Sequence, residues 1–186
     1  MAVFVLWPFR RACASLADLC AGKDGPSRPV VLSVLVVGLA MCLMSIRPVY
    51  HSREYALPEW LQWVLPGEDY YRVLLLMPLW GAWSMLITPQ FRRASGATEP
   101  YVAAMARGGG AGTAAACLVV PLAGSIFYFH YLGLRGEVVV SAVAALSAIA
   151  AGLVCCRAAG GLTRRALLAA NLLTQIAFLL AYLANR

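Results

Sequence analysis

The chain has 186 residues and a formal net charge of +7; 62% of its residues are apolar and only 12% are charged. The charged fraction is about half that of a typical soluble domain, and the mean hydropathy is +0.76 over the whole length. These values exclude an ordinary soluble domain and leave no room for a separate globular enzyme domain. They are typical of a multi-pass membrane protein.

Residues 1–29 are expected to form a cytoplasmic segment on the membrane surface. The apolar run before Arg10 is shorter than a signal peptide needs, and it contains Pro8. Apolar residues then recur at helical spacing, at Phe9, Ala12, Cys13, Leu16, Leu19 and Cys20. The opposite face carries Arg11, Ser15 and Asp18. This pattern predicts a short amphipathic helix, followed by a turn over the Gly- and Pro-rich residues 22–29.

The domain 30–186 contains five apolar runs, each long enough to cross the hydrocarbon core, which needs about 20 mostly apolar residues. Their expected bounds are 30–46, 71–88, 111–131, 138–156 and 166–183. The charged residue within these five predicted spans is Arg72, whose long side chain is expected to snorkel to the headgroups. The sequence therefore predicts an all-α polytopic membrane helix bundle, with five transmembrane helices plus an N-terminal interfacial amphipathic helix.

Basic residues are divided unequally between the two sides of this bundle. Ten of the fifteen lie in the N-terminal segment and in the connections after the second and fourth spans. The other five share their side with five of the eight acidic residues. Because short cytoplasmic loops hold the excess of Lys and Arg, the N-terminus is predicted to be cytoplasmic and the C-terminus outside or lumenal. The membrane is then a bacterial inner membrane or a eukaryotic endomembrane.

Aromatic residues at the expected outer ends of the spans agree with this orientation, since Trp and Tyr favour the membrane interface. They are Tyr70, Tyr71, Phe127, Tyr128, Phe129 and Tyr131. The outer connection also contains Pro58–Leu65, with two tryptophans three residues apart and Pro66-Gly67 behind it. This stretch predicts a short interfacial helix that anchors the loop.

The two histidines and six cysteines are the candidate metal or cofactor ligands. His51 and His130 fall on the same, outer side, where two imidazoles are compatible with a haem or a small metal site. A haem between helices would need histidines within the spans, so we interpret both as interfacial polar residues and predict no cofactor. The cysteines form no CxxC pair, which disfavours a zinc site. Reduced thiols are expected near the cytoplasmic face, at Cys13, Cys20, Cys155 and Cys156.

Small and polar residues within the spans indicate how the helices pack. Ala144, Ala148 and Gly152 follow one another at four-residue spacing on the fourth span, and Gly108 and Gly112 form a similar step where the third span starts. Asn171 and Gln175 share one face of the fifth span and are expected to hydrogen-bond a neighbouring helix. The predicted spans contain no carboxylate, which disfavours a proton or cation pump.

Several short features resemble the Yip1-domain membrane proteins. They are Leu6-Trp-Pro-Phe9, Pro78 with Trp80 in the second span, Gly96 with Tyr101 before the third, and the five-span layout. Pro121 lies 20 residues after Tyr101, further than in those proteins, and the acidic and aromatic cytoplasmic signature of the eukaryotic members is missing. The resemblance implies a non-enzymatic membrane organiser or partner-binding subunit, and it carries over no GTPase-binding role.

We therefore expect a protein without catalytic chemistry that acts through membrane lipid and through a protein partner or a second copy of itself. Its basic residues are scattered in short clusters, so no nucleic-acid partner is expected. One alternative is a membrane-anchor subunit of a larger transporter or quinone-linked redox complex. A second is a small membrane enzyme at the outer face, built from polar residues there, namely His51, Ser52, Glu54, Glu59, Glu68, Asp69 and His130.

Overall fold

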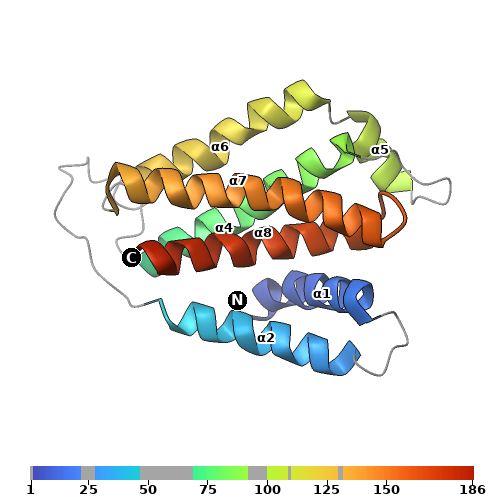
Figure 1. The fold of residues 1–186 in the computed structure, drawn as a ribbon, viewed down its shortest axis with the longest axis horizontal. Coiled ribbons are helices and arrows are strands. Elements are labelled where there is room, and N and C mark those ends of the chain that lie inside the picture. Colours follow the sequence, from blue (N-terminus) through green and yellow to red (C-terminus); the bar gives the residue numbers. More distant parts are fainter. Residues whose placement is uncertain (1, 22–27, 47–68, 92–99, 109, 130–131) are drawn as a thin grey trace.

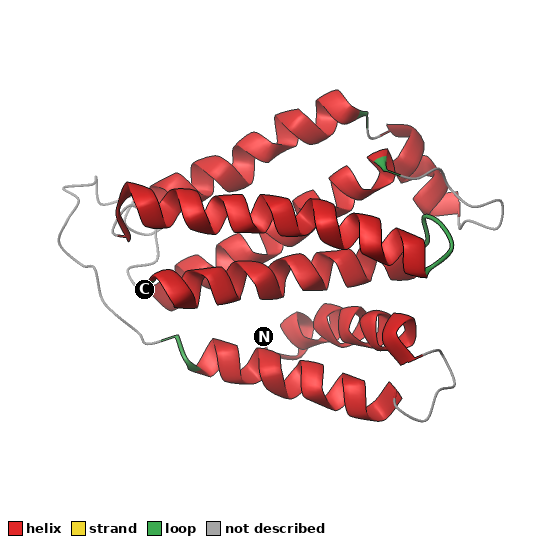
Figure 2. Ribbon diagram, in the orientation of Figure 1, coloured by secondary structure: helices red, strands yellow, loops and turns green. Residues whose placement is uncertain are grey.

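The computed structural model describes residues 2–21, 28–46, 69–91, 100–108, 110–129 and 132–186, and the elements that it contains there are helices (Figure 2). In chain order they are α1 (Ala2–Ala21), α2 (Arg28–Met44), α4 (Asp69–Ile87), the 3₁₀ turn η1 (Thr88–Gln90), α5 (Pro100–Gly108), α6 (Ala111–Phe129), α7 (Gly133–Ala158) and α8 (Arg164–Asn185). The all-α prediction is confirmed for these residues.

Four helical segments are long and apolar enough to cross a membrane: Arg72–Gln90, Ala111–Phe129, Gly133–Ala158 and Arg164–Asn185. They correspond to the second to fifth predicted spans. The first predicted span, 30–46, forms α2, which ends at Met44 and has 17 residues. At 1.5 Å per residue α2 is about 25 Å long, against about 30 Å of hydrocarbon core, so it is shorter than the other four.

The long helices α2, α4, α6, α7 and α8 reverse direction from one to the next along the chain (Figure 1). The starts of α2, α6 and α8 and the ends of α4 and α7 lie at the end of the bundle that carries α5, here named the α5 end. The opposite end, where α8 finishes, is named the C-terminal end. Helix α8 packs against α7, α4, α1 and α2, so it lies at the centre of the molecule.

The turn between α7 and α8 explains why this pair packs closely. The N–H of Gly160 donates to the carbonyl of Arg157 at 3.2 Å, and the N–H of Gly161 donates to that of Cys156 at 2.9 Å. This is the Schellman arrangement, and it requires the positive φ of 71° that Gly160 adopts. The Thr163 side chain then accepts from the N–H of Ala166 at 3.2 Å and caps the start of α8.

One hydrophobic cluster joins α4, α6, α7 and α8. The indole N–H of Trp80 donates to Ser125 Oγ at 3.0 Å, and that of Trp83 donates to the Ala114 carbonyl at 2.8 Å, so each buried indole has a partner on α6. Phe129 stacks on Tyr182 and Phe178, with ring centroids 5.1 and 5.8 Å apart respectively. Phe129 is the last residue of α6, at the helix end where the sequence places it, and these two rings of α8 bury it completely.

A second cluster closes the α5 end, where α1 and α5 cover α7 and α8. Its buried members are Ala12, Cys13, Leu16, Val102, Ala151, Cys155, Cys156, Leu162, Ala166, Leu167, Ala169, Ala170 and Leu172. Helix α5 was expected to be part of a loop, and it is the element that sequence reasoning missed. The side chain of Val102 on α5 is fully buried in this cluster, and this contact attaches α5 to the end of the bundle.

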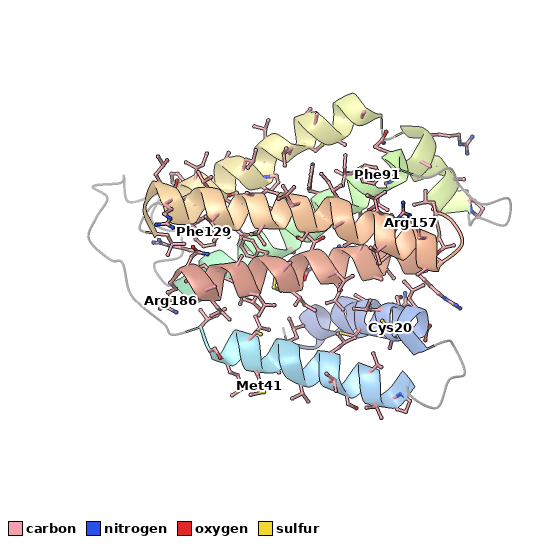
Figure 3. The ribbon with its side chains drawn as sticks, in the orientation of Figure 1. Cys20, Met41, Phe91, Phe129, Arg157 and Arg186 are labelled. Carbon is pink, nitrogen blue, oxygen red and sulfur yellow. The ribbon has the colours of Figure 1, made fainter. Side chains whose placement is uncertain are left out.

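Helix α1 is amphipathic as predicted, with differences in length and in two side chains. It begins at Ala2 instead of Phe9 and so includes Pro8. Ser15, expected on the wet face, is buried, and its hydroxyl donates to the Arg11 carbonyl at 2.8 Å, which satisfies the polar group inside the helix. Cys20, expected on the apolar face, is exposed (Figure 3).

Two charged residues at the C-terminal end are buried. Arg72 is 8% exposed and donates to the Tyr128 carbonyl of α6 at 3.4 Å, so the expectation that it snorkels to the headgroups is wrong. Helix α7 begins at Gly133, five residues before the predicted start, and therefore contains Arg135 and Glu137 in its first turns. Glu137 is 5% exposed, although it was expected in the outer connection.

Candidate functional site: a polar seam between α4 and α8

The polar side chains of α8 meet the C-terminal half of α4. Asn171 Nδ2 donates to the Met85 sulfur at 3.1 Å, and the side-chain amide of Gln175 donates to Asn171 Oδ1. We name this region the α4–α8 seam and define it as Gly81, Ser84, Met85, Asn171 and Gln175. The predicted hydrogen bond from the fifth span to a neighbouring helix is present at Asn171, while Gln175 bonds within its own helix.

Gly81 makes the seam possible because it has no side chain. A Cβ at this position would lie 2.6 Å from Gln175 Nε2 and 2.7 Å from Asn171 Oδ1, well inside contact distance. A larger residue would therefore have to displace these two amide side chains of α8 or separate the helices. Sequence reasoning missed Gly81, and the signal for it was a glycine at mid-span in a helix rich in large apolar residues.

The hydroxyl groups along these helices donate to backbone carbonyls. Ser84 Oγ donates to the Gly81 carbonyl at 2.7 Å, Thr88 Oγ1 donates to that of Ser84 at 2.6 Å, and Thr174 Oγ1 donates to that of Ala170 at 2.8 Å. Each hydroxyl proton is thereby used within its own chain segment. The seam consists of neutral groups, and its chemistry is that of hydrogen bonding and helix packing.

Gln175 Oε1 is a buried acceptor without a hydrogen-bond partner, on a side chain that is 7% exposed. An unsatisfied buried acceptor costs about 1–3 kcal/mol in proteins. Helix α8 therefore carries one acceptor at the seam whose capacity remains unused, beside an amide donor that is already bonded to Asn171.

The small residues predicted on the fourth span face the core. Ala144 and Ala148 are completely buried. A Cβ at Gly152 would lie 2.6 Å from Thr88 Oγ1 and 3.4 Å from Thr88 Cα, so α7 approaches the end of α4 and η1 closely here. The structure thus brings Ala144, Ala148, Gly152, Asn171 and Gln175 into the interior formed by α4, α7 and α8.

The step predicted from Gly108 to Gly112 is wrong, because the two glycines lie on different helices. Gly108 ends α5 and Gly112 lies in the first turn of α6. Gly112 is exposed, and no atom lies within 4 Å of the position that its Cβ would take. It therefore supports no close helix approach within this chain.

The histidines and cysteines are the remaining candidate ligands from the sequence. His51, His130 and the predicted interfacial helix Pro58–Leu65 lie outside the described residues. Within the described residues, no group of three His, Cys, Asp or Glu side chains is placed to hold a metal ion. All six cysteines are free thiols. Burial raises the pKa of the Cys13 thiol on α1, because an apolar surrounding disfavours the thiolate, so this cysteine is a core residue in its protonated form.

Comparisons with known proteins give no further assignment for this geometry. No protein-family model, curated protein or solved structure matches the chain.

Proposed function

We propose that this chain is a non-enzymatic integral membrane protein that acts through protein and lipid contacts. The observation that carries the proposal is the use of its interior polar groups. In the described part of the α4–α8 seam, amides and hydroxyls bond to groups of α4 and α8 themselves, and Gly81 leaves the space that the amides occupy. Polar groups that hydrogen-bond within the bundle stabilise it, and the outer surface is then the part that contacts lipid or other proteins.

The outer surface of the described helices supports such a role. Helix α2 exposes Val34, Val37, Met41 and Met44, and α6 exposes Val119, Val120, Ile126 and Phe127. Met41 lies on the side of α2 that faces away from the bundle (Figure 3). Exposed side chains of this size suit either lipid tails or the apolar surface of another membrane protein.

We further propose that α2 is the first of five spans and that the N-terminus is cytoplasmic. The alternating direction of the five long helices supports this layout (Figure 1), and so does the unequal division of basic residues. Helix α1 then lies on the cytoplasmic side with the α5 end. The same layout underlies the resemblance to Yip1-domain proteins, which agrees with a partner-binding role.

The proposed orientation is tested with single cysteines in a variant that lacks the native ones. A membrane-impermeant maleimide added from outside is expected to modify a cysteine at Ser52 and to leave one at Ser95 unmodified. The connections that hold these two positions lie on opposite sides in a five-span layout. Modification of Ser95→Cys alone would contradict the proposed orientation, and modification of both would show that α4, the helix between the two positions, does not cross.

The proposed contacts are tested by introducing a photo-crosslinking amino acid into the protein and irradiating it in its native membrane. Probes at Met41 on α2 and at Val119 on α6 should sample the two exposed faces, and a probe at the buried Ala148 serves as the control. We expect a defined protein adduct, to another protein or a second copy, from one exposed face and none from Ala148. Lipid adducts alone at both exposed positions would contradict the partner-binding role.

A further inference from the structure

The α5 end carries four exposed arginines, which come from three helices. Arg107 lies in the last turn of α5, Arg157 in the last turn of α7, and Arg164 and Arg165 in the first turn of α8. All four are exposed. Figure 3 shows Arg157 at this end of the bundle, and Arg186 at the other.

The fold explains why residues so distant in sequence gather here. The turn 159–163 is short, so it places Arg157 directly beside the start of α8. Helix α5 is attached to the same end because its Val102 is buried with Cys156 and Leu162 in one cluster. We name the four residues Arg107, Arg157, Arg164 and Arg165 the basic end surface.

Arg164 and Arg165 lie at the N-terminus of α8, where the helix dipole is also positive. The start of a helix carries a partial positive charge, which favours acidic side chains. The first turn of α8 contains no acidic residue and instead carries Arg164 and Arg165. Asp18 of the neighbouring α1 carries one negative charge, which offsets one of the four arginine charges and leaves the others in excess. The local excess of positive charge therefore favours binding of an anion from outside the chain.

The position of the basic end surface indicates which anion it binds. In the proposed five-span layout the surface lies at one end of the crossing helices α7 and α8, and the ends of crossing helices lie at the depth of the lipid headgroups. Guanidinium groups bind phosphate oxygens in a bidentate manner. Phosphate is abundant at this depth in the lipid headgroups, and acidic phospholipids add a net negative charge to it.

We propose that the basic end surface binds the phosphate groups of anionic phospholipids in the leaflet that faces the α5 end. This inference deepens the proposed function by naming the lipid class, and it rests on that function only in placing the chain in a membrane. Binding of this kind would hold α5 and the α7–α8 turn in the headgroup layer.

The test measures lipid binding to the full chain in mild detergent by native mass spectrometry, with phosphatidylglycerol and phosphatidylcholine as probes. We expect tighter binding of phosphatidylglycerol. Because loss of one hydrogen bond to a charged group corresponds to about tenfold in affinity, R164Q/R165Q should weaken this binding by about tenfold or more. The matched control is R135Q/R186Q, which removes two exposed arginines from the C-terminal end and should change the binding by less than about twofold.

Three results would overturn the proposal. Equal losses in the two double variants would indicate non-specific attraction. Displacement of phosphatidylglycerol by millimolar inorganic phosphate would identify free phosphate as the ligand, and displacement by a short RNA would identify nucleic acid. Unchanged phosphatidylcholine binding and melting temperature of R164Q/R165Q serve as the check that the variant is folded. Since these measurements are made in detergent, they do not depend on orientation, and the maleimide test at Ser52 and Ser95 can fail without affecting them.

Discussion

Replacement of Gly81 by leucine is expected to destabilise the bundle more than a leucine at any exposed position of α4. A Cβ alone would lie 2.6 Å from Gln175 Nε2, and the leucine branch would extend further into α8. Overpacking in a close-packed core costs about 1–3 kcal/mol, occasionally more, and separation of the helices would also lengthen the contact from Asn171 to Met85. The measurement is the melting temperature of the purified protein in detergent, with unfolding monitored by circular dichroism.

The control for this variant is Ala82→Leu, one residue along the same helix. Ala82 is exposed, so the added side chain meets lipid or detergent and should leave the melting temperature nearly unchanged. The double variant with Gln175→Ala should recover part of the loss at Gly81, because it removes the amide that the leucine would strike. Equal melting temperatures for Gly81→Leu and Ala82→Leu would mean that α4 does not pack on α8 through this face.

Gly152→Leu is expected to have the second large effect, at the contact of α7 with η1. A Cβ here would lie 2.6 Å from Thr88 Oγ1 and 3.3 Å from Thr88 Cβ. Thr88 has little freedom to move, because its hydroxyl donates to the Ser84 carbonyl at 2.6 Å. Leucine should therefore displace η1 and lower the free energy of unfolding by about 1–3 kcal/mol, measured by denaturation in mixed micelles.

Ala150→Leu is the matched control on α7, since Ala150 is exposed and two residues away. Ala148→Leu, one turn before Gly152 and completely buried, should act in the same direction as Gly152→Leu. A harmless Gly152→Leu together with a harmful Ala150→Leu would show that the other face of α7 is the packed one in the membrane.

Hydropathy was sufficient to locate the long helices. The second to fifth predicted spans all fall on helices, namely α4 with η1, α6, α7 and α8. A run of about 20 apolar residues is long enough to cross the bilayer and has no other stable conformation there. Helix ends were less well predicted. Helix α7 begins at Gly133, because a glycine turn and the burial of Glu137 extend it beyond the apolar run.

Short helices and single contacts escaped prediction for a different reason. Helix α5 has nine residues, a basic side chain in its last turn and glycine at its end, which is also the composition of a loop. The burial of Val102 against α7 and α8 stabilises it as a helix. The packing partners of Phe129 were missed in the same way, since a sequence pattern does not reveal its two aromatic contacts on α8.

Hydropathy and residue spacing were enough to predict a bundle of long apolar helices and the packing role of Ala144, Ala148 and Gly152. They did not reveal that Gly81 faces Asn171 and Gln175, that Gly112 faces outward and that Arg72 is buried; these follow from the packing of the helices. The physical reason is that lipid and protein interior are both apolar. A membrane helix then shows little difference between its two faces, and the face that meets a neighbour is set by shape and by a few hydrogen bonds.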